Sequence, residues 1–203
     1  EEKEKYACDI CIVANGTDYK GWIEQSFGEL PTELYDSCKA VIDATVEASV
    51  AAMCGAVKSP FKAGKQEFCY TVAGNLPKSD SRIVNAEVLP APLKVKDKEY
   101  NVTRYTFSID RKDDSHAVLS EIEQHIRNAT WDIEQVDSSD LLWYIPQQTV
   151  KSQGAYNGNP ESIRRIPVKA FCPEGLKNVW VLGPCAEISR ELAAKVMRPV
   201  QIG

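Results

Sequence analysis

Short apolar runs separated by polar stretches dominate the first quarter of the chain. Cys8–Ala14 and Ala40–Ala44 are rich in β-branched and small apolar residues, as expected of short strands that are buried on both faces. The polar segment Asn15–Thr32 lies between them. Glu47–Val57 then repeats its apolar residues at helical spacing, which predicts a helix soon after the second strand.

The middle of the chain alternates apolar and polar residues with a period of two. Phe68–Val72 and Tyr105–Ile109 show the alternation most clearly, and the shorter segments Ile83–Val88 and Leu93–Val95 lie between them. Strands of this kind have one buried face and one solvated face, which is typical of an antiparallel sheet. The pattern predicts a β-rich lobe from about Gln66 to Ile109.

Helical spacing returns in the second half, where Ser115–Arg127 predicts a helix capped by Asp114 or Ser115. A Gly- and Asn-rich segment, Lys151–Ser162, predicts an exposed loop. The remaining elements expected from apolar runs are strands at Leu141–Ile145, Ile166–Phe171 and Asn178–Leu182 and a helix at Glu187–Met197.

These elements predict a mixed α/β fold in one domain. Cys8–Ala14, Ala40–Ala44 and Asn178–Leu182 are expected to form a small, partly parallel sheet, with the antiparallel lobe adjoining it. Val41 and Val181 should therefore lie in the same sheet. The expected sub-lobes are residues 1–60 together with 172–203, and residues 61–171.

Composition and charge narrow the class of protein. Of 203 residues, 43% are hydrophobic and 26% are charged, which is ordinary for a globular domain. The formal net charge of −5 argues against nucleic-acid binding, which needs clustered Lys and Arg. The longest apolar run, Val41–Val57, contains Asp43 and Glu47 and is too short to cross a bilayer. We therefore expect no membrane span.

Metal-binding residue types are present, but their spacing argues against a site. Cys8 and Cys11 form a C-x-x-C within a predicted strand, where residues three apart face opposite sides, so we predict no zinc there. His116 and His125 are nine residues apart on one predicted helix, about 180° from each other. They cannot share a metal, and surface positions are expected for both. No pattern assigns a catalytic residue.

Three N-x-[ST] sequons begin at Asn15, Asn101 and Asn128. They favour a secreted or organellar location, and coincidence is the alternative explanation. The seven cysteines are an odd number, so at least one has no partner within the chain.

Three segments share a resemblance to a known family. Residues 39–47 read KAVIDATVE, residues 166–185 read IPVKAFCPEGLKNVWVLGPC, and the chain ends VMRPVQIG. These segments resemble the FAD-dependent oxidoreductases of the glutathione-reductase-like class, in which a strand reads VIDATG and a later strand reads NLxVAGRC. The first strand, ACDICIV, is similar to the dinucleotide-binding strand of that family. The resemblance implies a Rossmann-like parallel sheet, with 1–60 plus 172–203 as the cofactor-domain remnant and 61–171 as the substrate-domain part.

The departures from the family pattern concern its phosphate-binding glycines. Where the family has G-x-G-x-x-G after the first strand, only Gly16 could serve, and Asp18 would repel a phosphate. Val46 stands in place of the glycine of D-A-T-G, and Pro184 in place of an arginine. The chain therefore looks like a shortened and degenerate member of the family, in which FAD binding is weak or lost.

The resemblance also implies where a cofactor would lie, at the crevice outside the strand ends. The implied cofactor-binding residues are Val13, Gly16, Asp43, Ala44, Thr45, Gly183 and Cys185. The interpretation that we favour is a non-catalytic or weakly active relative that acts as a binding or assembly subunit, with a protein partner or as a homo-oligomer. The first alternative is an FAD-dependent oxidoreductase that retains its flavin, and the second is an unrelated α/β binding domain.

Overall fold

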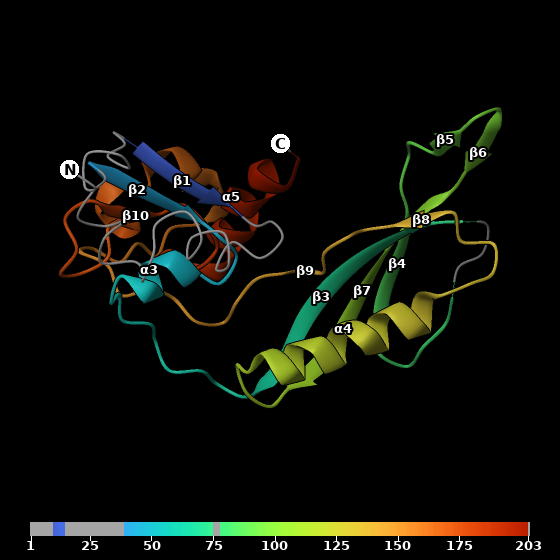
Figure 1. Ribbon diagram of the computed structural model, residues 1–203, viewed down its shortest axis with the longest axis horizontal. Coiled ribbons are helices and arrows are strands. Elements are labelled where there is room, and N and C mark those ends of the chain that lie inside the picture. Colours follow the sequence, from blue (N-terminus) through green and yellow to red (C-terminus); the bar gives the residue numbers. More distant parts are fainter. Residues whose placement is uncertain (1–9, 15–38, 75–77, 203) are drawn as a thin grey trace, which may run out of the picture. The chain divides into compact units, whose positions relative to one another are not determined.

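The computed structural model describes residues 10–14, 39–74 and 78–202 of the chain, which has a mixed α/β fold (Figure 1). The chain divides into two compact units. The first contains residues 1–60 and 145–203, and the second contains residues 61–144. Residues 145–171 thus belong to the first unit, whereas the expected sub-lobes grouped all of them with the β-rich part.

A three-stranded parallel sheet forms the centre of the first unit. Its order is β1 (Ile10–Ala14), β2 (Ala40–Ala44) and β10 (Val179–Val181). In the register, Val41 pairs with Val179, and Val181 pairs with Asp43. The prediction that Val41 and Val181 share a sheet is confirmed. The prediction came from the apolar runs at these strands. Such runs are expected in a parallel sheet because both of its faces are covered.

The helices of the first unit differ in extent from the predicted ones. α3 (Ser49–Met53) is shorter than the predicted Glu47–Val57. It starts after Ala48, which has a left-handed φ of 49°, and stops before Gly55, at φ 90°. α5 (Arg190–Ile202) starts three residues after the predicted Glu187.

The predicted strand at Ile166–Phe171 is wrong. This region forms two 3-10 turns, η2 (Pro160–Arg165) and η3 (Val168–Phe171), and the N–H of Ala170 donates to the carbonyl of Pro167 at 2.9 Å. The alternation of apolar residues in this segment is typical of a strand, which is why a strand was predicted. Proline, however, has no N–H for a ladder, and Pro167 serves as the N-cap of η3 instead.

The segment predicted as an exposed loop, Lys151–Ser162, is partly anchored to the first unit. Ser152 forms a bridge with Pro173, and Tyr156 forms one with Ile188. Just before it, the Val150 N–H donates to the carbonyl of Cys185 at 2.7 Å. Two apolar clusters accompany these contacts. The first is centred on Val41, Val50, Val150, Val179, Val181 and Cys185, and the second on Ala170, Ala186, Ile188, Leu192 and Ala193.

The second unit is built on an antiparallel sheet, with β4 (Ile83–Val88), β7 (Val102–Arg111), β3 (Gly64–Ala73) and β8 (Asp137–Ser138) in that order. β9 (Trp143–Tyr144) also pairs with β3. Alternate residues of β3 and β7 are buried, as the period of two predicts. The expected antiparallel β-rich lobe is thus present.

One helix, α4 (His116–Thr130), packs against the sheet of the second unit (Figure 1). Ser115 caps it, because its hydroxyl accepts from the N–H of Val118 at 3.3 Å. Ile122 and Ile126 are its buried apolar residues. Both predicted surface histidines lie on this helix: His116 is exposed, and His125 is half-buried with its Nε2 at 3.7 Å from Asp80.

A small hairpin of β5 (Leu93–Val95) and β6 (Lys98–Tyr100) forms a separate two-stranded sheet. Its turn places Lys96 at a left-handed φ of 55°. β5 agrees with the predicted segment, whereas β6 was not predicted, because its charged residues carry no strand signal.

Among the residues that the structure describes, no helix is both long and apolar enough to cross a bilayer.

Candidate functional site

The carboxyl ends of β1, β2 and β10 meet at one edge of the parallel sheet. Val13 pairs with Asp43, which pairs in turn with Val181, and Ala14 pairs with Ala44. Open parallel sheets bind ligands outside this edge. The structure thus brings Val13, Asp43, Ala44 and Thr45 together with the start of the 183–185 segment, whereas Gly16 lies outside the described residues.

Asp43 is fully buried, and both of its carboxylate oxygens are engaged within the protein. Oδ1 accepts from the N–H of Thr45 at 2.9 Å and from its hydroxyl at 2.7 Å. Oδ2 accepts from the N–H of Ala51 in α3 at 2.7 Å. Burial raises the pKa of Asp43, and these three hydrogen bonds oppose the rise. The carboxylate therefore joins the end of β2 to the first turn of α3.

The hydroxyl of Thr45 completes this junction. It accepts from the N–H of Ser49 at 2.9 Å while it donates to Asp43. The first N–H groups of a helix have no intrahelical acceptor, so side-chain oxygens at these positions stabilise the helix start. Asp43 and Thr45 thus act as caps of α3, and their polar atoms are turned towards the protein.

Gly183 allows the ends of β2 and β10 to approach closely. A Cβ at this position would lie 3.2 Å from the carbonyl oxygen of Thr45, a tight contact with backbone. Next to it, the N–H of Leu182 donates to the carbonyl of Asp43 at 2.8 Å. Strand packing alone therefore accounts for a glycine here.

Cys185 lies behind this edge as a buried thiol. Its Sγ donates to the carbonyl of Val46 at 3.2 Å. Burial raises the pKa of Cys185 to about 12 and that of the nearby Cys54 to about 11. Both are protonated at neutral pH, and a protonated thiol is a poor nucleophile and a poor metal ligand.

This protonation predicts slow chemical modification of Cys54 and Cys185. A rise of the pKa from 9.0 to about 11 lowers the thiolate fraction about hundredfold, and to about 12 about thousandfold. At pH 8, we expect iodoacetamide to label both residues at least about a hundred times more slowly in the native protein than in urea. Peptide mass spectrometry resolves each cysteine. Cys172 is the internal control because the contact of its Sγ with the carbonyl of Val168 is exposed, and equal native and unfolded rates at Cys185 would contradict the assignment.

Arg190 is a half-buried residue of this region that sequence reasoning missed. Its guanidinium donates four hydrogen bonds of 2.9–3.3 Å, and all of the acceptors are backbone carbonyls. The acceptors are Pro146, Pro184, Ala186 and Ile188. Arg190 therefore fixes the segment between β10 and α5. The residue pattern around Arg190 did not indicate this role, because the acceptors are backbone atoms that only the fold brings together.

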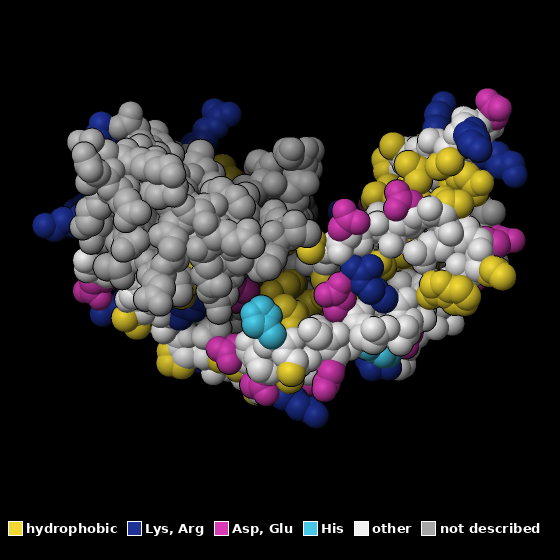
Figure 2. Space-filling model, viewed as in Figure 1, with side chains coloured by type: hydrophobic (Ala, Val, Ile, Leu, Met, Phe, Trp, Pro, Cys, Tyr) yellow, Lys and Arg dark blue, Asp and Glu magenta, His cyan; other side chains and the backbone are white. Residues whose placement is uncertain are grey.

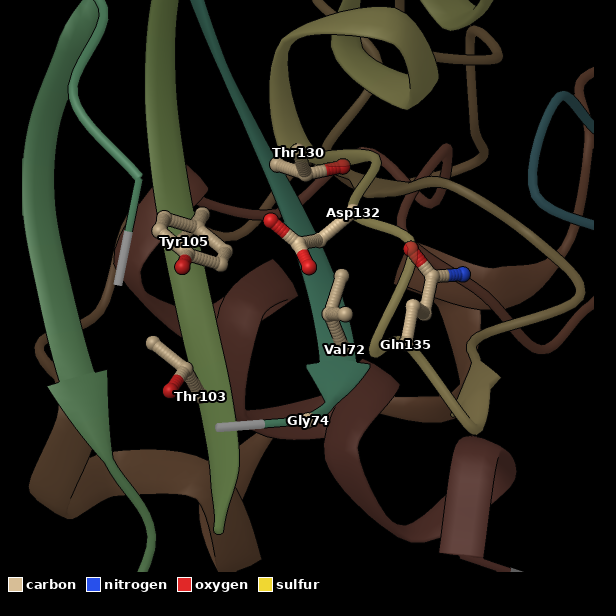
Figure 3. A pocket seen from close by; sticks show the side chains of 7 residues that line it. All are labelled: Val72, Gly74, Thr103, Tyr105, Thr130, Asp132 and Gln135. Carbon is tan, nitrogen blue, oxygen red and sulfur yellow. The ribbon is translucent and has the colours of Figure 1, made fainter. Parts of the chain in front are cut away.

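The second unit contains a small pocket (Figure 3). It is lined by Val72, Gly74, Thr103, Tyr105, Thr130, Asp132 and Gln135. Its polar groups already have partners: Tyr105 accepts from the N–H of Lys78 at 2.9 Å, and Asp132 pairs with the Lys78 ammonium. The pocket has room for about one water molecule. It is too small for an organic substrate.

Within residues 10–14, 39–74 and 78–202, no three His, Cys, Asp or Glu side chains are grouped as a metal site. Cys8 lies outside these ranges, so the prediction for the Cys8 and Cys11 pair stays a prediction. Comparison of the chain with protein-family models, with curated proteins and with solved structures gave no match in any of the three.

Proposed function

We propose that the chain is a non-catalytic or weakly active relative of the FAD-dependent oxidoreductases and acts as a binding or assembly subunit. The observation that carries this proposal is the saturation of Asp43. Its Oδ2 and the hydroxyl of Thr45 accept from N–H groups of α3, and its Oδ1 accepts from the N–H and the hydroxyl of Thr45. The polar side chains at the sheet edge are therefore committed to the fold, and they leave little to hold a cofactor.

The relationship to the family is supported by the pairing of the first strand with two of the resembling segments. KAVIDATVE contains β2, NVWVLG contains β10, and ACDICIV contains most of β1. Segments far apart in the sequence thus lie in one parallel sheet with their carboxyl ends at one edge. The same convergence favours the alternative function, an oxidoreductase that retains its flavin, because this edge is where a dinucleotide would bind.

The choice between these two functions depends on glycines. Val46 replaces a family glycine, and only Gly16 remains of the glycine-rich turn. Each lost close approach removes an N–H bond to phosphate of about 1.5–3 kcal/mol, or roughly one to two decades in affinity. We therefore expect purified protein to be colourless, with flavin well below one per chain.

Assembly is supported by apolar side chains on the surface of the second unit. Trp131 is 64% exposed and Ile133 is 86% exposed. Exposed apolar side chains that gather in one place are typical of surfaces that bind other proteins.

A flavin titration with a restored glycine tests the proposal. Val46→Gly should bind FAD at least about ten times more tightly than the wild type, because a backbone N–H can then approach the pyrophosphate. Isothermal titration calorimetry gives both affinities. Val57→Gly is the matched control, since Val57 is exposed at 64% in the same unit. Stoichiometric flavin in the wild type after gel filtration would instead establish the oxidoreductase alternative.

If neither the wild type nor Val46→Gly binds FAD, the proposed cofactor site is wrong. The unrelated α/β binding domain then becomes the better description. The thermal denaturation midpoint of each variant shows whether a negative result reflects unfolding.

A further inference from the structure

The hairpin of the second unit is a basic arm, which we define as residues 89–101. Lys94, Lys96 and Lys98 are all exposed along it, together with Asp97 and Glu99, so its formal net charge is +1. Val95 is 41% exposed, and it lies on the same hairpin face as Leu93, because residues two apart on a strand share a face. Figure 2 shows apolar side chains gathered below the charged tip of this arm. The arm thus presents apolar and cationic groups together.

A second surface of the same unit has the opposite charge. The acidic patch, defined as residues 131–141, contains four carboxylates and no Lys or Arg. Its exposed apolar side chains are Trp131, Ile133, Val136 and Leu141, which are 41–86% exposed. The basic arm and the acidic patch are therefore complementary in charge, and both expose apolar side chains that a partner could cover.

The two surfaces lie at the same end of the sheet. Ala73 pairs with Val102, directly after the arm, and also with Asp137 of the acidic patch. The N–H of Gly74 donates to the carbonyl of Asn101 at 3.0 Å, and that of Val136 donates to the carbonyl of Ala73, also at 3.0 Å. Both surfaces are therefore anchored to the last residues of β3.

The strands and two of the lysines of the arm make few interactions with the rest of the described chain. β5 and β6 pair only with each other within the described part of the chain, and an isolated two-stranded hairpin is marginally stable in water. Lys94 pairs with Glu99 at 2.8 Å, but Lys96 and Lys98 form no ion pair with a described residue. The same holds for the carboxylates of Asp137 and Asp140 in the acidic patch. The arm thus offers cations, and the acidic patch offers anions, that could form ion pairs with a partner.

We propose that the basic arm of one copy of this chain docks on the acidic patch of a second copy, and that the second arm does so in return. The proposal rests on the assembly role proposed above and names the partner. A second copy is favoured because complementary surfaces at one end of the same sheet allow a closed two-fold dimer, in which each contact occurs twice. Burial of Val95 and Trp131 would supply the apolar part of the interface.

Sedimentation velocity over a range of protein concentrations measures the association. We expect a monomer–dimer equilibrium that weakens as salt is added, because the ion pairs are near the surface. Lys96→Glu with Lys98→Glu should weaken the dimer at least about tenfold, since like charges would then face each other. The control is Lys62→Glu with Lys112→Glu, a pair of equally exposed lysines near the other end of β3 and β7.

A charge exchange tests the reciprocal geometry. Variant A carries Lys96→Glu and Lys98→Glu, and variant B carries Glu134→Lys, Asp137→Lys and Asp140→Lys, so that the arm of variant A and the patch of variant B each reverse the sign of their net charge. Each alone should be monomeric, because its arm and patch have the same charge. Mixed together, they should form a heterodimer of about wild-type strength, since both of its contacts then join opposite charges. Circular dichroism confirms that each variant is folded.

A wild-type chain that stays monomeric at all concentrations would overturn the proposal. A dimer that variant A does not weaken, or folded variants A and B that fail to associate when mixed, would do the same. These outcomes are independent of flavin binding, so they distinguish a wrong interface from a wrong proposed function.

Discussion

Replacing Asp43 by alanine is expected to lower the free energy of unfolding of the first unit by about 3 kcal/mol. The N–H groups of Thr45 and Ala51 would lose their acceptor inside the protein. A buried N–H left without a partner costs about 1–3 kcal/mol, and removal of a buried carboxylate offsets part of this cost. Hydrogen exchange of the β2 and β10 amides measures the loss. A change within about 0.5 kcal/mol would show that the cap is dispensable.

Asp43→Asn and Asp110→Ala are the comparisons for this measurement. Asparagine keeps one oxygen but turns an NH₂ group towards an N–H, so an intermediate loss of about 1–2 kcal/mol is expected. Asp110 is an exposed residue of β7, and its replacement should change little.

The pH dependence of Asp43 has a definite sign. Its folded-state pKa is raised above the ordinary value of 3.8, so the folded protein binds this proton more tightly than the unfolded chain. The stability that it contributes is complete below pH 3.8 and is lost as pH rises through the folded-state pKa. The stability of the wild type relative to Asp43→Asn should therefore decrease as pH rises from acid. A rising difference would mean that the hydrogen bonds outweigh burial.

Replacing Arg190 by methionine is expected to cost about 2–4 kcal/mol. Four carbonyls between Pro146 and Ile188 would lose their donor at once, although methionine keeps most of the side-chain volume. Urea unfolding followed by hydrogen exchange at Val179–Val181 and α5 is the measurement. We expect the largest loss of protection in the Pro184–Ser189 segment.

Arg190→Lys is the matched control because it keeps the charge. An ammonium has three donors and lacks the planar fork, so it cannot reach all four carbonyls, and we expect about half of the loss. If lysine restored full stability, the charge and not the hydrogen bonds of Arg190 would explain its role.

These two residues hold the segments at the sheet edge together. In an open parallel sheet, a ligand-binding crevice needs polar groups that face outward. Here Asp43 faces α3, and Arg190 faces the carbonyls of the segment before α5. The chemistry that the sequence suggested for this edge is thus used to hold the fold together, which is consistent with the binding role that we propose.

The sequence by itself determined several strands of both units. Ala40–Ala44 and Ile83–Val88 agree with β2 and β4 to the residue, because short apolar or alternating runs have one stable arrangement in a sheet. It also limited the cap of α4 to Asp114 or Ser115, and the structure has Ser115, whose hydroxyl accepts from an N–H three residues later. These signals are local, and so they can be read without the fold.

Only the tertiary structure decided what the polar residues do. The sequence placed Asp43 and Thr45 at a strand end, but the acceptor role towards Ala51 depends on where α3 turns back, eight residues later. The Ile166–Phe171 alternation was misleading because a strand needs a neighbour to pair with, and the structure uses Pro167 to start a turn. Arg190 and the two complementary surfaces join residues that are distant in sequence. Hydrogen bonds to backbone carbonyls and surface exposure leave no periodic pattern, so they became visible only in three dimensions.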